Sequence, residues 1–74
     1  MLDSLRSEEI LKKVGAKLNK RRKAKKLSMR ALASLAGVDY SQIDKIEKGR
    51  LNCTILTIIA IADALEIPAS KLID

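Results

Sequence analysis

The sequence predicts one all-α domain of five short helices, and three observations carry this prediction. Apolar residues recur at three- and four-residue steps along most of the chain, which is the period of an amphipathic helix. Short polar segments and glycines separate these runs, and no segment has the pattern of a strand. The length of 74 residues suits a single core over residues 1–74. Tyr40 is the one aromatic residue, so the core should be aliphatic.

The first helix is expected to span about Ser7 to Ala24. Leu11, Val14 and Leu18 repeat at helical spacing and should face the core. Ser7 is a suitable N-cap, and the two glutamates after it suit the positive end of the helix dipole. Basic residues gather in the last turns, where the same dipole favours cations.

A second helix should begin after Ser28, which is a good N-cap, and should carry Leu32, Leu35 and Ala36 toward the core. Gly37 is expected to end it, because glycine readily adopts the left-handed conformation just past a helix. A tight turn therefore joins this helix to the next one.

The third helix should be capped by Asp39, with Gln42 three residues later completing a capping-box-like pair. Ile43 and Ile46 give this helix an apolar inner face, and Gly49 is expected to end it. Helical spacing turns its polar side chains outward. Two short helices around a glycine turn, the second with a polar outer face, indicate a helix-turn-helix.

A fourth helix is expected from about Ile55 to Leu65, with Thr54 as its N-cap. Pro68 should begin a last short helix, and residues 50–53 should form a loop. The residues of the fourth helix that are expected to face the core are Ile55, Ile58, Ile61, Ala62 and Leu65.

Positive charge is concentrated in the first third of the chain. The net charge is +6, and residues 1–26 hold ten lysines or arginines against three acidic residues. The densest run is residues 20–26. Such a run either contacts an acidic partner or is a solvated helix face that maintains solubility.

Composition excludes several classes of protein. There is no histidine, and the single cysteine, Cys53, can form neither an internal disulfide nor a cysteine-rich zinc site. We therefore expect no metal and no cofactor, and no enzyme, because no residues suggest an acid–base pair. No apolar run is long enough to span a bilayer and the first residues do not form a signal peptide, so we expect a cytoplasmic protein without a membrane partner.

Residues 28–49 and their surroundings resemble the Cro and phage-repressor (XRE-type) family of helix-turn-helix transcriptional regulators. The residues that fall at the family's spacing are Leu32-Ala33, Gly37-Val38, Ile43, Ile46 and Glu47-Lys48-Gly49. The likeness covers roughly Val14 to Leu72. It implies the five-helix lambda-repressor-like fold, sequence-specific binding to double-stranded DNA, and a homodimer on a palindromic operator. A solitary domain of this size most resembles a small repressor or a restriction-modification controller.

The resemblance makes residues 40–48 the recognition helix. It implies base contacts by Tyr40, Ser41, Asp44 and Lys45. Lys45 can donate to guanine O6 or N7, and Asp44 can accept from cytosine N4. Tyr40 suits a thymine methyl or a phosphate, and the alternative is an ordinary surface aromatic. Gln42 is expected to cap the helix rather than to touch DNA.

Other basic and polar residues are assigned to phosphates, which set register and supply salt-dependent affinity. Lys48 and Arg50 flank the Gly49 turn, and Lys23 on the first helix is a further candidate. Ser28 and the backbone amides at the start of the second helix should hold a phosphate, because Met29 stands where the family commonly has a glutamine.

The resemblance also implies a buried ion pair between Arg22 and Glu47. An arginine late in the first helix pairs with a glutamate near the end of the recognition helix in several family members. Such a pair is poor evidence of stability, because desolvation can cancel the attraction. We expect it to fix the angle at which the recognition helix is presented.

The fourth helix carries more hydrophobic residues than one core face requires. Leu56, Ile59 and Ala60 fall on another side, and with Ile73 in the tail they are the predicted dimer interface within residues 55–74. The alternative is that residues 2–10 fold back and cover this stripe.

Two rival functions are compatible with the sequence. One is an antitoxin that also binds a toxin protein and regulates its own gene, and RNA polymerase is a further partner of regulators of this kind. The other is a protein-interaction domain that has lost DNA binding, for which Met29 and Asp44 are the evidence.

Overall fold

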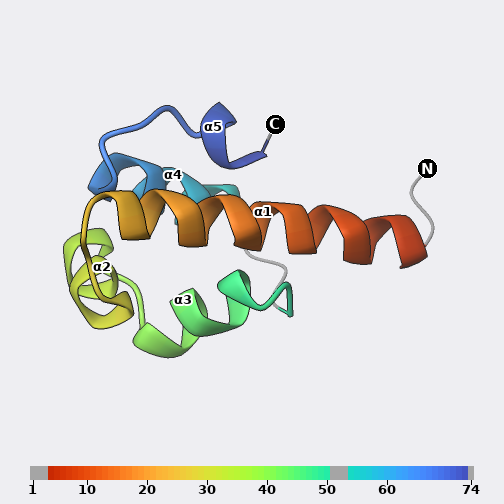
Figure 1. Cartoon of the computed structure of the whole chain (residues 1–74), viewed down its shortest axis with the longest axis horizontal. Coiled ribbons are helices and arrows are strands. Elements are labelled where there is room, and N and C mark those ends of the chain that lie inside the picture. Colours follow the sequence, from red (N-terminus) through yellow and green to blue (C-terminus); the bar gives the residue numbers. More distant parts are fainter. Residues whose placement is uncertain (1–3, 51–53, 74) are drawn as a thin grey trace.

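A computed structural model of the chain describes residues 4–50 and 54–73 (Figure 1). It contains five helices and no strand within those ranges, as predicted. The predicted loop residues 51–53 lie outside the described part. The helices are α1 (Ser4–Ala24), α2 (Met29–Ala36), α3 (Tyr40–Glu47), α4 (Ile55–Ala64) and α5 (Ser70–Ile73).

The long helix α1 is the axis around which the others are arranged. It packs against α3 on one flank and against α5 on the other (Figure 1). Helix α2 contacts α3 and α4, so it closes the same end of the bundle at which α1 finishes. None of the described helices combines the length and the apolar character that a membrane span needs.

The core is aliphatic, as predicted. All five helices contribute to it, and seven of its side chains are almost fully buried. The buried hydrophobic residues are Leu18, Leu32, Ala33, Ile43, Ile46, Ile58, Ile61, Ala62, Leu65 and Leu72.

Helix α1 begins earlier than expected. It starts at Ser4 rather than after Ser7, so Ser7 is not its N-cap and the two glutamates are not in its first turn. The residues from Ser4 to Ser7 include no glycine or proline that would stop the helix from extending. The concentration of basic residues in its last turn is confirmed.

Two of the four expected N-caps, Ser28 and Thr54, are confirmed. The Ser28 hydroxyl accepts from the amide of Ala31 at 3.0 Å, and the Thr54 hydroxyl accepts from the amide of Thr57 at 3.2 Å. Asp39 occupies the N-cap position of α3, but its side chain makes no capping hydrogen bond. The predicted capping-box-like pair with Gln42 is therefore wrong.

Two predicted core residues lie on the surface instead. Leu35 is 63% exposed and Ile55 is 71% exposed. On α2 the buried residues are Leu32 and Ala33, because the inward face is centred closer to Leu32 than the spacing suggested. Ile55 is the first residue of α4 and lies beyond the part of the helix that the core encloses. Helix α4 ends at Ala64, one residue before the expected Leu65.

The last helix is also shorter than predicted. It begins at Ser70 rather than at Pro68 and ends at Ile73. Leu72 anchors it, since this side chain is only 1% exposed.

Candidate nucleic-acid interface

The turn between α2 and α3 sets the direction of the second helix. Gly37 has φ of 71° and ψ of 32°, which is the left-handed conformation predicted for it. Its amide donates to the carbonyl of Ser34, and the amide of Val38 donates to the carbonyl of Ala33 at 3.0 Å. A side chain would meet no atom at Gly37, so the backbone conformation is what requires glycine there.

Helix α3 has one apolar and one polar face. Ile43 and Ile46 point into the core, with exposed fractions of 0% and 2%. Tyr40, Ser41 and Lys45 are exposed outside this inner face. The helix that was predicted to read DNA is therefore held by its isoleucines and leaves its polar side chains accessible.

Asp44 and Lys48 are joined on the outer side of α3. The Nζ of Lys48 lies 3.1 Å from Oδ2 of Asp44, one helical turn away. Exposed pairs of this kind contribute only about 0.3–0.5 kcal/mol. This ion pair can therefore open at small cost, which leaves both side chains accessible to other partners.

Arg22 and Glu47 form the ion pair that the resemblance implied. Nε of Arg22 donates to Oε2 of Glu47 at 2.6 Å, and Nη2 donates to Oε1 at 3.0 Å. The two side chains are only 9% and 5% exposed. Nη1 of Arg22 also donates to the carbonyl of Leu27 at 2.8 Å, so one guanidinium connects α1, α3 and the loop that precedes α2.

Asn19 completes this network, and the sequence analysis did not identify it. Its Nδ2 donates to Oε1 of Glu47 at 2.7 Å. Its position one turn before Arg22 on α1 was the available signal, because residues three apart share a helix face.

The network changes the acidity of both members of the ion pair. Burial alone would raise the pKa of Glu47, but hydrogen bonds from Arg22 and Asn19, with the charges of Arg22 and Lys23, hold that pKa below its ordinary value. The hydrogen bond to Glu47 is the main cause that raises the pKa of Arg22. Both groups are therefore charged in the folded protein at neutral pH.

Two glycines bring the backbone of α1 against the end of α3, and neither contact was predicted. A Cβ on Gly15 would lie against the carbonyl oxygen of Ile46 and 2.7 Å from that of Glu47. A Cβ on Gly49 would lie 3.1 Å from Cα of Lys12, and Gly49 also has φ of 70°. Gly15 in the middle of a helix was the available signal, since glycine there is unfavourable unless packing requires it.

Arg30 is a second residue that the sequence analysis missed. Its guanidinium carbon lies 4.7 Å from the centroid of the Tyr40 ring, so a cation–π contact joins the first turns of α2 and α3. Tyr40 is 41% exposed. The contact orients the ring and adds a positive charge beside the predicted base-contacting residues.

The predicted phosphate-binding residues are accessible. Ser28, Lys23 and Arg50 are exposed, and the amide of Arg50 donates to the carbonyl of Lys45, which ties the segment after α3 to that helix. Met29 packs against the core and is half-buried, so it does not act as a polar anchor. The Ser28 hydroxyl oxygen accepts the capping bond, so its own proton can still be donated to another acceptor.

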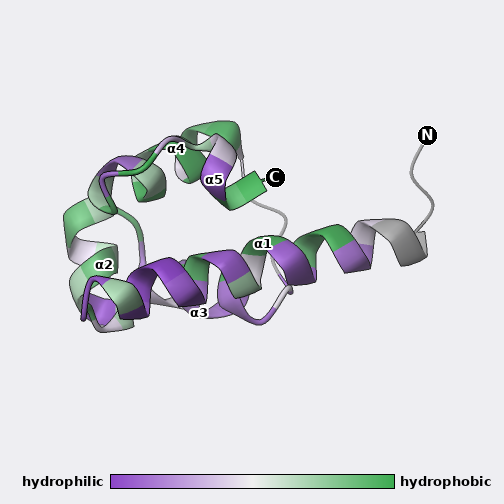
Figure 2. Cartoon of the chain, turned by 45° about the horizontal axis from the view of Figure 1, so that its top comes forward, coloured by the Kyte–Doolittle hydropathy of each residue, from purple (hydrophilic) through white to green (hydrophobic). Residues whose placement is uncertain are grey.

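Large hydrophobic side chains are exposed on α2, α4 and α5, and Figure 2 shows α4 as predominantly hydrophobic ribbon. We call this set the apolar surface, and its residues are Leu35, Ile55, Leu56, Ile59 and Ile73. Ala60, which was also predicted for the dimer interface, is half-buried. Residues 4–10 continue helix α1 away from the bundle (Figure 1), so this part of the chain does not fold back over the surface as the alternative required.

A short helix with an exposed polar face, held at a set angle by a left-handed turn and a buried ion pair, defines a helix-turn-helix DNA-binding domain. The chain belongs to the helix-turn-helix (HTH_3) family of DNA-binding transcriptional regulators, whose model matches residues 18–72. A comparison with curated proteins gave no match.

Solved structures place the chain among regulators of this family. It is similar to the restriction-modification controller protein C.AhdI from Aeromonas hydrophila, with 39% identity, a TM-score of 0.82, and 84% of this chain and 94% of that chain covered. An HTH_3 family transcriptional regulator from Vibrio cholerae is 32% identical, with a TM-score of 0.85. Its comparison covers 89% of this chain and 37% of that longer one. A hypothetical transcription factor from Neisseria, 24% identical with a TM-score of 0.86 over 92% of this chain and 78% of that one, shares the fold.

Proposed function

We propose that this protein is a transcriptional regulator that binds a palindromic operator as a homodimer through α3, in the manner of a restriction-modification controller or a small repressor. The observation that carries the proposal is the exposed face of α3, with Tyr40, Ser41 and Lys45 turned away from the core. The similarity to C.AhdI over nearly the full length of both chains supports the controller class.

The proposed reading of DNA follows from this geometry. Helix α3 enters the major groove, where Lys45 donates to guanine and Ser41 pairs with a neighbouring base. Lys48 and Arg50 contact the phosphates beside one end of the helix. Ser28 and the amides at the start of α2 contact phosphates at the other end, near Arg30.

The proposed dimer uses the apolar surface. An exposed leucine or isoleucine forgoes about 1.5–3 kcal/mol that burial would supply, and five such side chains lie on this surface. A second copy of the chain buries them in a two-fold interface. Two α3 helices then lie about 34 Å apart, in successive major grooves of one face of the duplex.

A mobility-shift experiment with the DNA upstream of the protein's own gene tests this function. Wild type should shift the fragment at nanomolar concentration, and Lys45→Ala should weaken binding by about 1–3 kcal/mol. Lys13→Ala is the control, because this exposed lysine lies on α1 far from the exposed face of α3. The absence of a shift at low salt would favour the interaction domain over the regulator.

The dimer is tested separately by sedimentation. Leu56→Glu places a charge on the most exposed residue of the apolar surface, at 78%. We expect wild type to sediment as a dimer at micromolar concentration and Leu56→Glu as a folded monomer with weaker operator binding. A wild-type monomer at that concentration would remove the proposed interface.

A further inference from the structure

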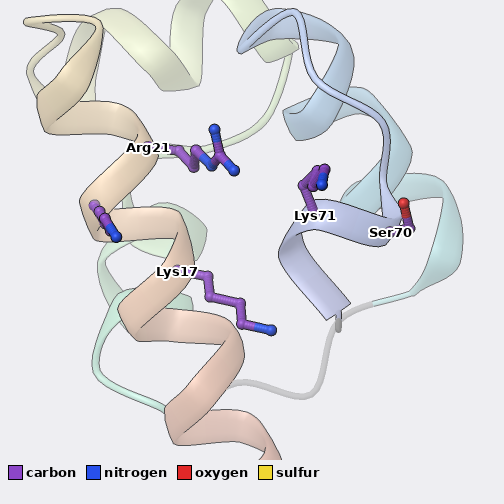
Figure 3. A pocket seen from close by; sticks show the side chains of 5 residues that line it. Lys17, Arg21, Ser70 and Lys71 are labelled. Carbon is purple, nitrogen blue, oxygen red and sulfur yellow. The ribbon is translucent and has the colours of Figure 1, made fainter.

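A hollow lined by cations lies on the flank of α1 that faces away from α3. It opens between α1 and α5 and has a volume of about 290 Å³. Its lining residues are Lys17, Lys20 and Arg21 from α1 and Ser70 and Lys71 from α5. Figure 3 shows Lys17 and Arg21 extending from α1 toward α5, where Lys71 and Ser70 stand on the facing helix.

The charges around this hollow are not compensated within the described structure. Among residues 7–50 and 54–73, the ion pairs join Arg22 to Glu47, Lys25 to Glu66 and Lys48 to Asp44. None of them uses a cation of the hollow, and no acidic side chain lines it. Four like charges within about one Debye length repel one another, so an anion between them would be stabilised.

We propose that this hollow binds an oligophosphate, that is, a chain of phosphate groups rather than a single ion. The arginine provides a planar pair of donors that matches phosphate oxygens, the lysines provide point charges, and the serine hydroxyl provides a further donor. The volume is roughly ten times the share of one liquid water, which is room for more than one phosphate.

The position of the hollow separates it from the proposed operator contacts. Helices α3 and α5 pack on different flanks of α1, so a duplex held by α3 does not fill the hollow (Figure 1). The lining contains no leucine, isoleucine, valine or aromatic residue to anchor a peptide. The phosphates can come from a free molecule, such as a nucleoside polyphosphate, or from the backbone of a nucleic-acid strand.

Calorimetric titration of the full chain with inorganic tripolyphosphate tests this site. We expect saturable binding at an ionic strength where sodium chloride alone produces none. The double variant Arg21→Ala/Lys71→Ala should lower the affinity at least about tenfold, because charged hydrogen bonds contribute roughly 1.5–3 kcal/mol each. Lys45→Ala on α3, on the other flank of α1, should leave the affinity within about twofold of wild type, and circular dichroism verifies that each variant is folded.

A parallel titration distinguishes the two sources of phosphate. A single strand of about ten nucleotides that binds through Arg21 and Lys71 while tripolyphosphate does not would identify a nucleic-acid backbone as the occupant. Binding of tripolyphosphate identifies a free oligophosphate. The proposal is overturned if neither ligand depends on Arg21 and Lys71, or if Lys45→Ala reduces binding as much as the double variant.

Discussion

The basic side chains on the two flanks of α1 lie in opposite environments. On the flank that faces α3, Arg22 is paired with Glu47, supported by Asn19, and almost excluded from solvent. On the flank that faces α5, Lys17, Arg21 and Lys71 surround a hollow without an ion pair in the described structure. The basic residues of α1 therefore lie in two different surroundings: Arg22 is paired and buried against α3, whereas Lys17 and Arg21 face an open hollow.

The same difference predicts that only one flank of α1 is sensitive to small changes in side-chain size. Toward α3 the backbones meet at Gly15, where no side chain fits. Toward α5 the helices are spaced far enough apart to leave an open volume. Packing against α3 should tolerate almost no substitution, whereas the lining of the hollow should tolerate many.

The largest expected effect is the loss of Arg22. Arg22→Met leaves Glu47 buried without its main partner, which should lower the free energy of unfolding by about 3–5 kcal/mol at neutral pH. Operator binding should fall by more than one lost phosphate contact accounts for, because α3 loses its support. Chemical denaturation and salt-titrated binding measure the two effects.

The double variant Arg22→Met/Glu47→Met is the matched control for that experiment. Replacing both partners by apolar residues of similar size should recover most of the lost stability. A binding defect that persists in the double variant would support a positioning role of the ion pair. If Arg22→Met changes the salt dependence of DNA binding only by the amount expected for one lost phosphate contact, that role is contradicted.

The next effect concerns the close approach of the backbones. Gly15→Ala should lower the free energy of unfolding by about 2 kcal/mol, because the new methyl group meets the carbonyls of Ile46 and Glu47. The adjacent exposed residue is the control: Ala16→Gly should cost only about 1 kcal/mol, the ordinary propensity difference. Stabilisation by Gly15→Ala would show that the two helices are not in contact there.

A smaller effect is the pH dependence of the ion pair. The pKa of Glu47 is lower in the folded protein than in the unfolded chain. Its stabilisation is therefore complete above the unfolded value, about 4.3, and is lost as the pH falls through the lower, folded pKa. Thermal unfolding between about pH 2 and 5 should show this loss, and Glu47→Gln should remove that part of it. An equally steep loss in the variant would assign it to other carboxylates.

The smallest effect is expected at the hollow. Lys71→Glu places a negative charge opposite Lys17 and Arg21 and should raise the free energy of unfolding by about 0.5 kcal/mol at low salt. The gain should vanish in about 1 M salt, where the Debye length is roughly 3 Å. A loss of stability at low salt would mean that Lys71 already has a partner that this substitution removes.

Periodicity was sufficient to predict the five helices and most of the aliphatic core. It was wrong for Leu35 and Ile55, because a helical period defines a stripe, and only the neighbouring helices decide how much of that stripe they cover. The N-terminal boundary of α1 was missed by three residues for a similar reason, since a good N-cap at Ser7 does not prevent helix from extending before it.

The polar face of α3 was predicted from helical spacing, and the Arg22–Glu47 pair was predicted from positions within a family pattern. Asn19, Arg30 and Gly15 were not, since their roles depend on which side chain or carbonyl another helix brings opposite them. The hollow beside α5 is of the same kind. Its lysines were visible in the sequence, but their convergence with Lys71 is a result of packing.

The ratio of operator to random-DNA affinity tests most directly whether α3 reads bases while its neighbours hold phosphates. Lys45→Ala should reduce that ratio about tenfold or more and relax selection at one base pair. Lys48→Ala should weaken binding to both DNAs equally and reduce the salt slope by about one. If the ratio is unchanged in Lys45→Ala, the exposed face of α3 does not select the site and the account is contradicted.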